Sequence, residues 1–206
     1  MAGIPKHTKN VLDLTFMDIA SEENLLEKIR DETGKQIRSP SKKALATFTS
    51  GPKSLTQPIP DPEFIKAIRL ANNKMESMET LVGPMLANLD TGGVLWLDLS
   101  FNQISSLGSE ELVPSAFPNV TTIYLHANNI SKLAQLKKLR NFPKLKSLTL
   151  YGNPVEEHKH YRNYVMHYCP QLHQFDSSPV TGSERKRNEV WAQTFRKVLN
   201  REEEDW

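Results

Sequence analysis

Two glutamates and two histidines form the densest group of side chains that could bind a metal ion. Glu156, Glu157, His158 and His160 lie within a short stretch of the chain. Carboxylates and imidazoles are common zinc ligands, but a zinc site needs three or four of them around one point. Alternate residues on a solvated turn are a weak ligand set, so we expect no metal site.

Motifs that identify enzymes are missing from the sequence. It has no Gly-rich phosphate loop, no Gly-x-Ser-x-Gly elbow, no paired-cysteine motif and no His-Glu-x-x-His helix. His167 and His173 belong to an aromatic segment, where we expect them to serve packing. Because no nucleophile and base can be placed together, we expect no catalysis, no cofactor and no small-molecule substrate.

Cysteine usage and hydropathy indicate the compartment. Cys169 is the single cysteine, so no internal disulfide can form, which fits a reducing environment. It ends an apolar, aromatic stretch with helical spacing, which favours a buried structural thiol over a nucleophile. The chain starts without an apolar signal region and has no run of the roughly 18 apolar residues that span a bilayer. We therefore expect a cytoplasmic protein without membrane contact.

Four apolar segments that end in asparagine must position any binding residues. Each fits the pattern L-x-x-L-x-L-x-x-N, and the asparagines are 29, 26 and 25 residues apart. The segments are Ile65, Ile68, Leu70 and Asn73; Val94, Leu97, Leu99 and Asn102; Val120, Ile123, Leu125 and Asn128; and Leu145, Leu148, Leu150 and Asn153. Stacked repeats bury apolar side chains that one unit cannot cover alone. The asparagine amides, with donors and an acceptor, can satisfy the backbone groups at each turn.

This pattern predicts an α/β fold, namely a short leucine-rich-repeat solenoid with a parallel sheet on its concave side. The alternative is an ordinary α/β domain with Leu-rich strands. We expect an extended N-terminal tail over 1–60, repeats over 61–158, a C-terminal cap over 159–182, and a C-terminal helix with an acidic tail over 183–206. The tail should hold a short helix near 21–32 capped by Ser21, with Leu25, Leu26 and Ile29 on one face, and then a basic, Pro-rich linker.

The cap and the last helix have their own signals. Tyr161, Tyr164, Val165 and Tyr168 recur at helical spacing, and Leu172, Phe175 and Asp176 form a degenerate final strand. A solenoid needs such a cap to hide the edge and underside of its last strand. Thr181 and Glu184 form a capping box before a helix whose charged remainder could project and bind a partner. Its apolar residues are Val190, Trp191, Phe195, Val198 and Leu199.

Alternate strand residues point outward and define the concave face. Three columns result: Ala67, Trp96, Thr122 and Ser147; Arg69, Asp98, Tyr124 and Thr149; and Ala71, Ser100, His126 and Tyr151. Aromatic and charged residues are enriched at interface hot spots. We therefore predict partner contacts at Arg69, Trp96, Asp98, Tyr124, His126 and Tyr151. Alternatively, Trp96 and Tyr124 pack on each other or against the N-terminal tail.

A basic segment covers residues 131–150, which contain no acidic residue. Its members are Lys132, Lys137, Lys138, Arg140, Lys144 and Lys146. It forms either a solvated face or a surface that docks onto an acidic partner. The interleaved Leu133, Leu136 and Leu139 should face the core from the convex side.

Several runs of sequence resemble the capped leucine-rich-repeat proteins found in cilia and in the spliceosome. These runs are LWLDLSFNQIS, IYLHANNISKL, LKSLTLYGNPVEE, YRNYVMHYCPQLHQFD and PVTGSER. The tract from GNPVEE to VTGSER resembles their shared C-terminal cap. A narrower resemblance, carried by GPKSLTQ, WLDLSFN and SLTLYGNPVEEHKHYRNYV over residues 51–191, points to one small group associated with ciliated cells. The first 50 residues and the insertion at 108–118 depart from it.

The resemblance implies a non-enzymatic adaptor in the axoneme of motile cilia and flagella. Its partners would be axonemal proteins of a large assembly, with microtubule contact as one option. The alternative is an adaptor of a nuclear ribonucleoprotein, which should offer basic or stacking groups to RNA. Asp98 lies in the middle of the concave face, most lysines lie on the convex edge, and the net charge is only +2. We therefore expect no nucleic-acid partner.

Overall fold

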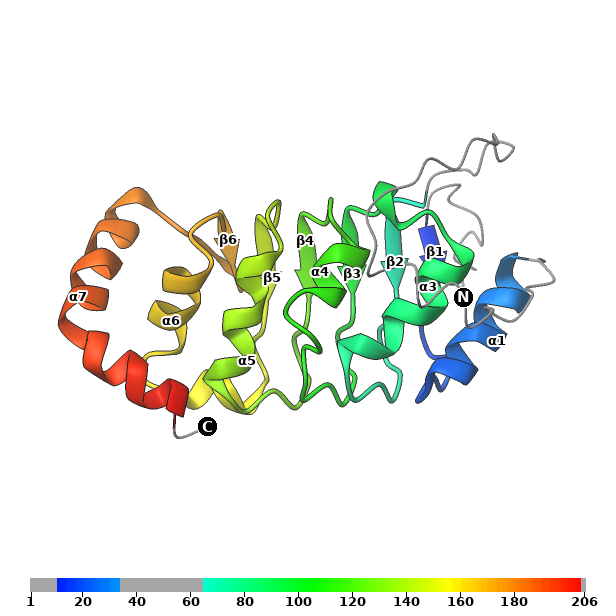
Figure 1. Ribbon diagram of the computed structural model, residues 1–206, viewed down its shortest axis with the longest axis horizontal. Coiled ribbons are helices and arrows are strands. Elements are labelled where there is room, and N and C mark those ends of the chain that lie inside the picture. Colours follow the sequence, from blue (N-terminus) through cyan, green and yellow to red (C-terminus); the bar gives the residue numbers. More distant parts are fainter. Residues whose placement is uncertain (1–10, 34–64, 205–206) are drawn as a thin grey trace, which may run out of the picture.

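The computed structural model describes residues 11–33 and 65–204, and Figure 1 shows their strands side by side in one row. The predicted basic linker and the last two residues of the acidic tail lie outside the described residues. One sheet follows the chain order from β1 to β7, parallel up to β6 and antiparallel at β7. The strands are β1 Val11–Asp13, β2 Ala67–Arg69, β3 Trp96–Asp98, β4 Thr122–Tyr124, β5 Ser147–Thr149, β6 Gln174–Phe175 and β7 Ser178–Pro179.

Short helical segments connect the strands on the convex side. They are η2 Met78–Leu81, α3 Val82–Asn88, η3 Thr91–Gly93, α4 Leu112–Ala116, α5 Leu133–Lys137, η4 Lys138–Asn141 and η5 Pro154–Glu157. The ends of the molecule carry the longer helices α1 Glu22–Thr33, α6 Tyr161–Tyr168 and α7 Gly182–Glu204. The predicted leucine-rich-repeat solenoid is therefore confirmed.

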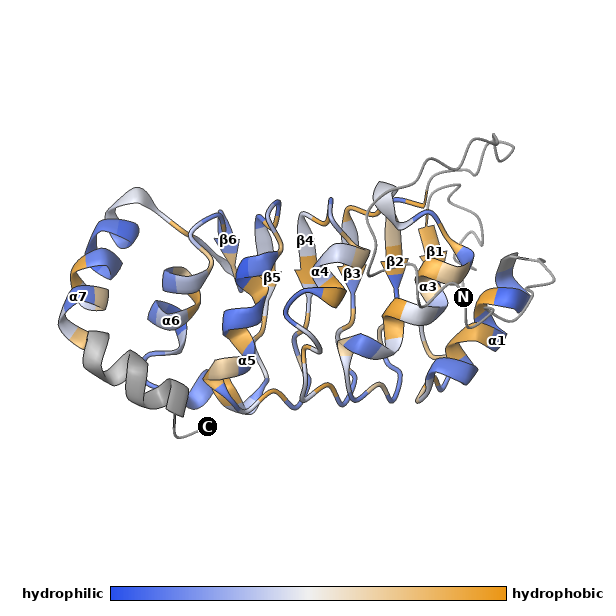
Figure 2. Cartoon of the chain, in the orientation of Figure 1, coloured by the Kyte–Doolittle hydropathy of each residue, from blue (hydrophilic) through white to orange (hydrophobic). Residues whose placement is uncertain are grey.

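The strands pair in the register that the repeat pattern predicts. Ala67 lies opposite Trp96, Trp96 opposite Thr122, and Thr122 opposite Ser147. The middle residues of these strands point inward and are buried, as are Leu133, Leu136 and Leu139 from the convex side. Figure 2 shows the apolar residues gathered on the strands and the helices beside them, whereas the start of α7 is mostly hydrophilic. The core is thus continuous along the row of strands, as stacking requires.

The asparagines that end the four repeats form a column inside the solenoid. Each of them joins two successive turns. The amide nitrogen of Asn128 donates to the carbonyls of Leu99 and Leu125 at 2.9 and 3.0 Å. Its Oδ1 accepts from the backbone N–H of Ile104 at 2.9 Å. Asn73, Asn102 and Asn153 repeat this arrangement. Buried backbone groups at the turns are therefore satisfied by side chains.

The residue before each asparagine takes a left-handed backbone conformation. Its φ is 57° at Asn72, 54° at Phe101, 55° at Ala127 and 72° at Gly152. This conformation is favourable for Gly and Asn but strained for a bulky residue. Phe101 is therefore the costly member of the series.

Residues 11–33 extend the solenoid, whereas the sequence analysis assigned them to an extended tail. Strand β1 pairs with β2, and Leu12 and Leu14 are buried like the apolar residues of the later repeats. Met17 stands where the repeats have asparagine, and its backbone N–H donates to Asn73 at 3.0 Å. The predicted helix does form. Ser21 caps it, Leu25 and Ile29 are buried, and it packs on α3.

The C-terminal cap closes the other end of the sheet. Strand β7 pairs with the outer edge of β6, so the parallel sheet does not end on an open strand there. Asp176 accepts hydrogen bonds from the backbone N–H groups of Leu150 and Tyr151 at 2.7 and 3.1 Å. The hydroxyl of Tyr161 donates to the other Asp176 oxygen at 3.1 Å. One carboxylate thus ties the last repeat to α6.

Helix α7 does not project from the molecule over its described length, contrary to the expectation from sequence. It lies against α6 and α5 (Figure 1). Thr181 caps it by accepting from the Glu184 N–H at 3.2 Å, but the Glu184 carboxylate binds Arg162 at 2.6 and 3.1 Å. Val190, predicted to be part of the apolar face, is 63% exposed. The side chains of Val198 and Leu199 lie outside the described residues.

Candidate functional site

The concave face carries a row of ring side chains that contact one another in sequence. We call Trp96, Tyr124, His126 and Tyr151 the aromatic strip. Trp96 and Tyr124 meet edge to face with centroids 5.5 Å apart. Tyr124 and His126 are 6.0 Å apart, and His126 stacks on Tyr151 at 4.6 Å with the planes 12° apart. The structure therefore joins four predicted contact residues from three repeats into one surface.

The rings of the strip hold one another but remain reachable. Trp96, Tyr124 and His126 are half-buried, and Tyr151 is 41% exposed. The alternative that Trp96 and Tyr124 pack on each other is thus part of the arrangement, and it leaves ring surface for a partner. Aromatic pairs in such geometries contribute about 0.5–1.5 kcal/mol beyond their buried area, which fixes their orientation before binding.

His126 is the chemically most informative member of the strip. Its Nδ1 lies 2.9 Å from Thr149 Oγ1, which sets the ring orientation. Burial lowers the pKa of His126 below its usual value, although the carboxylates of Asp98 and Asp176 oppose that shift. The imidazole is therefore neutral near pH 7.

A charged pair adjoins the strip on its N-terminal side. Arg69 Nη1 binds Asp13 Oδ2 at 2.8 Å, and Arg69 Nε lies 3.9 Å from Asp98 Oδ2. Asp98 is only 8% exposed, and its Oδ1 accepts from the backbone N–H and hydroxyl of Ser100 at 3.2 and 2.7 Å. The predicted contact residues Arg69 and Asp98 therefore lie beside the strip, with Asp98 turned mainly to structural hydrogen bonds.

Two residues of this surface, Asp13 and Phe101, were not predicted from the sequence. Asp13 was missed because β1 was not predicted. Aligning Leu12 and Leu14 with Ile68 and Leu70 would have placed it beside Arg69. Phe101, 53% exposed, meets the edge of His126 at 5.3 Å. Phe16 occupies the same turn position in the first repeat and is also exposed, but it lies at the far end of the solenoid and is not part of the strip.

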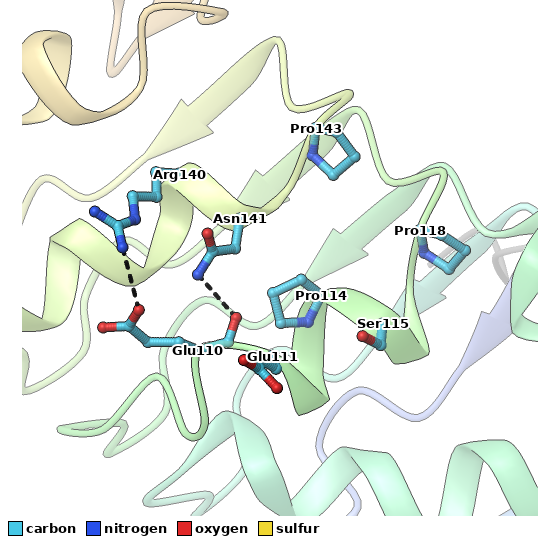
Figure 3. A pocket seen from close by; sticks show the side chains of 8 residues that line it. All are labelled: Glu110, Glu111, Pro114, Ser115, Pro118, Arg140, Asn141 and Pro143. Atoms are coloured by element: carbon cyan, nitrogen blue, oxygen red, sulfur yellow. Dashed lines mark hydrogen bonds and ion pairs between the residues drawn. The ribbon is translucent and has the colours of Figure 1, made fainter. Parts of the chain in front are cut away.

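A groove lies elsewhere, between α4 and η4. It has a volume of about 550 Å³ and is lined by Glu110, Glu111, Pro114, Ser115, Pro118, Arg140, Asn141 and Pro143. Figure 3 shows Arg140 and Asn141 reaching across it to Glu110. These contacts are an ion pair of 3.5 Å and a hydrogen bond of 2.9 Å to the Glu110 carbonyl. Three of the polar residues that line the groove thus bind each other, which makes it a weak candidate for a ligand site.

Most basic side chains of residues 131–150 also have contacts within the molecule. Lys138 donates to the Gly108 carbonyl at 2.7 Å, and Lys144 donates to Asn119 at 2.5 Å. Lys137 lies over the ring of Tyr168, 5.5 Å from its centroid. Together with Arg140 at the groove, four of the six basic residues stabilise neighbouring repeats, which favours the solvated-face interpretation over docking.

The other residues with possible chemistry serve packing. His160 contacts Trp191 and Phe195 of α7, with centroids 5.4 and 4.9 Å apart. Among the side chains described in residues 11–33 and 65–195, no three His, Cys, Asp or Glu are grouped to hold a metal ion. Cys169 is buried, and desolvation raises the pKa of its thiol to about 12.

None of the helices in the described part of the chain has the length and apolar character to cross a membrane.

Sequence comparisons agree with this architecture. Residues 61–202 match the family described as Leucine-rich repeat. Leucine-rich repeat-containing protein 51 of Rattus norvegicus is 36% identical over 147 residues, which cover 70% of this chain and 69% of that protein. Its Bos taurus counterpart is 46% identical over 96 residues, 47% of this chain and about half (48%) of the relative. The narrower resemblance seen in the sequence is therefore a resemblance to leucine-rich repeat-containing protein 51.

A further protein is similar in sequence over part of the chain, and one solved structure shares the fold. The U2 small nuclear ribonucleoprotein A' of Neurospora crassa is 38% identical over 89 residues, 43% of this chain and 34% of that protein. A chain in the crystal structure of the Drosophila melanogaster SNF/U2A' complex superposes with a TM-score of 0.64 at 21% identity. That match covers 93% of this chain and 87% of the other. At this identity the likeness shows the fold alone.

Proposed function

Since this chain belongs to the leucine-rich repeat family, whose repeats form a protein–protein interaction domain, we propose that it is a non-enzymatic adaptor that binds a protein partner through its concave face. One observation carries the proposal. The aromatic strip joins outward side chains of three repeats into a single surface that residues 11–33 and 65–204 leave at least partly exposed. A solenoid gains its binding surface from such repetition.

The composition of the surface fits a protein partner. Trp, Tyr and Arg dominate interface hot spots, and all three occur within the strip or beside it. The rings are held by mutual contacts and by Thr149, so a partner orders few side chains on binding. A preorganised surface loses less conformational entropy, which favours affinity.

The cellular setting is a further part of the proposal. We place the protein in the cytoplasm and in the axoneme of cilia or flagella, as a structural component of a large assembly of axonemal proteins. The similarity to leucine-rich repeat-containing protein 51, combined with the resemblance of that group to ciliary proteins, supports this setting. Contact with microtubules belongs to the same proposal.

An adaptor of a nuclear ribonucleoprotein is the second candidate. The similarity to the U2 small nuclear ribonucleoprotein A' supports it. The charges of the concave face favour the first candidate, because Asp98 and Asp176 lie close to His126 of the strip and would repel phosphate.

Exchanging Trp96 and Tyr124 together for alanine tests the concave face. We expect loss of the partner from affinity captures made with the tagged protein in ciliated cells, and an unchanged circular dichroism spectrum. The control is Val190→Ala, on the exposed side of α7. Retained partner binding by the double variant would show that the contacts lie outside the concave face.

Cross-linking mass spectrometry on extracted axonemes tests the setting. Lys74 and Lys132 are suitable reporters, because both side chains are exposed near the turns. Cross-links to axonemal neighbours would support the adaptor in cilia. Recovery in a nuclear RNA–protein fraction, with absence from axonemes, would favour the second candidate.

A further inference from the structure

We infer that the C-terminal half of the aromatic strip, Tyr124, His126 and Tyr151, receives an arginine side chain of the partner, so that the partner presents a basic segment to this surface. The inference rests on the proposed function and names the chemistry that its contact surface recognises. Three observations carry it: the arrangement of the rings, the carboxylates around them, and the strained Phe101.

The rings offer the geometry that a guanidinium needs. His126 and Tyr151 are nearly parallel at 4.6 Å, and Tyr151 keeps 41% of its surface exposed. Tyr124 approaches the same imidazole at an angle of 57°. A planar cation can stack on one ring and meet another at its edge, which is how arginine binds aromatic groups.

Carboxylates lie on both flanks of these rings. Asp98 and Asp176 are the charged groups that act on His126, and both are acidic. Asp176 Oδ1 accepts from the Tyr151 N–H at 3.1 Å, and Glu156 accepts from the next backbone N–H, that of Gly152, at 2.6 Å. The backbone beside Tyr151 is therefore flanked by two carboxylate groups, both of which accept hydrogen bonds.

The basic residues nearest to these carboxylates have partners of their own. Arg162 is bound to Glu184 through two hydrogen bonds of 2.6 and 3.1 Å. Arg69 is paired with Asp13 at 2.8 Å and also lies 3.9 Å from Asp98. Aromatic rings beside carboxylates favour a cation, since an apolar segment would gain nothing from the charges and a nucleic acid would be repelled.

Phe101 adds an independent observation. Its φ of 54° is strained for an aromatic residue, and Gly152 shows that the same turn position accepts glycine. Strain of this kind persists where the side chain has a use. The ring is 53% exposed and lies edge-on to His126 at 5.3 Å. It extends the ring surface at the end of the strands, where the aliphatic stem of an arginine can pack.

A titration with a minimal probe tests the inference on the full chain. Nα-acetyl-arginine methylamide is added to isotopically labelled protein, and the backbone amide resonances of Tyr124, His126 and Tyr151 are followed. The neutral isostere Nα-acetyl-citrulline methylamide serves as the matched probe. We expect saturable shifts at these residues with arginine, weakened by salt, and about two- to fivefold weaker binding of citrulline.

Variants separate the rings from general surface effects. Tyr151→Leu is expected to lower the affinity for arginine to that for citrulline, and Phe16→Leu, an exposed ring at the far end of the solenoid, to leave it unchanged. Tyr151 is exposed, so its loss should not unfold the protein. Equal affinity for both probes, shifts that cluster elsewhere, or a response to single-stranded RNA in place of arginine would overturn the inference.

The outcome is independent of the test of the adaptor itself. If the Trp96 and Tyr124 double variant loses its partner while arginine and citrulline bind alike, the concave face still binds a protein, and only the inferred basic chemistry is wrong. If the double variant keeps its partner, the proposed site itself is wrong.

Discussion

The two sides of the same strands carry different kinds of residue. Inward, β3, β4 and β5 present Leu97, Ile123 and Leu148, which are all fully buried. Outward, neighbouring positions hold side chains as different as Trp96, Thr122 and Ser147. Stacking imposes one solution on the inner side, because every repeat must cover the next. The outer side is under no such constraint. Its residues can therefore differ from repeat to repeat and determine which partner binds.

The comparison predicts that inner and outer substitutions have separable effects. The largest is expected for Leu125→Ala, which removes a fully buried side chain from the middle of the core. It should lower the free energy of unfolding by about 2–5 kcal/mol through lost burial and a residual cavity. Chemical denaturation measures this. A loss below about 1 kcal/mol would mean that the repeats tolerate gaps and that the inner side is less constrained than its uniform composition indicates.

The second largest loss of stability is expected when an asparagine of the buried column is replaced. Asn128→Leu leaves the Ile104 N–H and the carbonyls of Leu99 and Leu125 without that partner. We expect a loss of about 1–3 kcal/mol in unfolding free energy. The matched control is Asn129→Leu, since the neighbouring Asn129 side chain is exposed. Equal losses for the two variants would contradict the role assigned to the buried amide.

Phe101 links the two sides, because an outward ring is held by a strained backbone. Phe101→Gly relieves backbone strain that costs about 1–3 kcal/mol. Glycine also raises the conformational entropy of the unfolded chain, which lowers stability and offsets part of this gain. We expect a change in unfolding free energy within about 1 kcal/mol, together with weaker partner binding. Ala127→Gly, at the same turn position of the next repeat, should match it in stability and keep partner binding. Binding losses in both variants would assign the effect to the turn and not to the ring.

Most of the inward-facing residues could be predicted from the sequence. The features that could not be predicted were hidden for physical reasons. A period of apolar residues located Leu97 and Ile123, and strand alternation then placed Trp96 and Tyr124 on the concave face. The first strand was missed because Met17 replaces the asparagine that marks a repeat, and the Asn73 side chain of the next repeat makes hydrogen bonds to this turn.

Contacts between residues far apart in the sequence were the second kind of feature that could not be predicted. The pairing of Arg162 with Glu184 requires α6 and α7 to be packed together, whereas the capping-box pattern assigned Glu184 to its own helix end. The left-handed turn at Phe101 was hidden for a similar reason. Phenylalanine does not favour that conformation, and only the register of the surrounding repeats imposes it.

The smallest effect concerns pH and belongs to the outer side. Burial lowers the pKa of His126, so the folded protein binds this proton less readily than the unfolded chain does. The contribution of His126 to stability is therefore complete above its usual pKa of about 6.5, and it declines as the pH falls toward the lowered value. His126→Gln should remove this slope. Unfolding measured across the range from neutral to mildly acidic pH, in the variant and in the parent protein, isolates the contribution.

The same protonation should weaken partner binding more visibly than stability. An imidazolium in the middle of the strip would repel an arginine and disturb the stack with Tyr151. Binding of the arginine probe should therefore fall with pH in the parent protein and stay constant in His126→Gln. If affinity for arginine rises on acidification, the carboxylates Asp98 and Asp176 do not govern the charge of this surface, and the outer side recognises its partner through its rings alone.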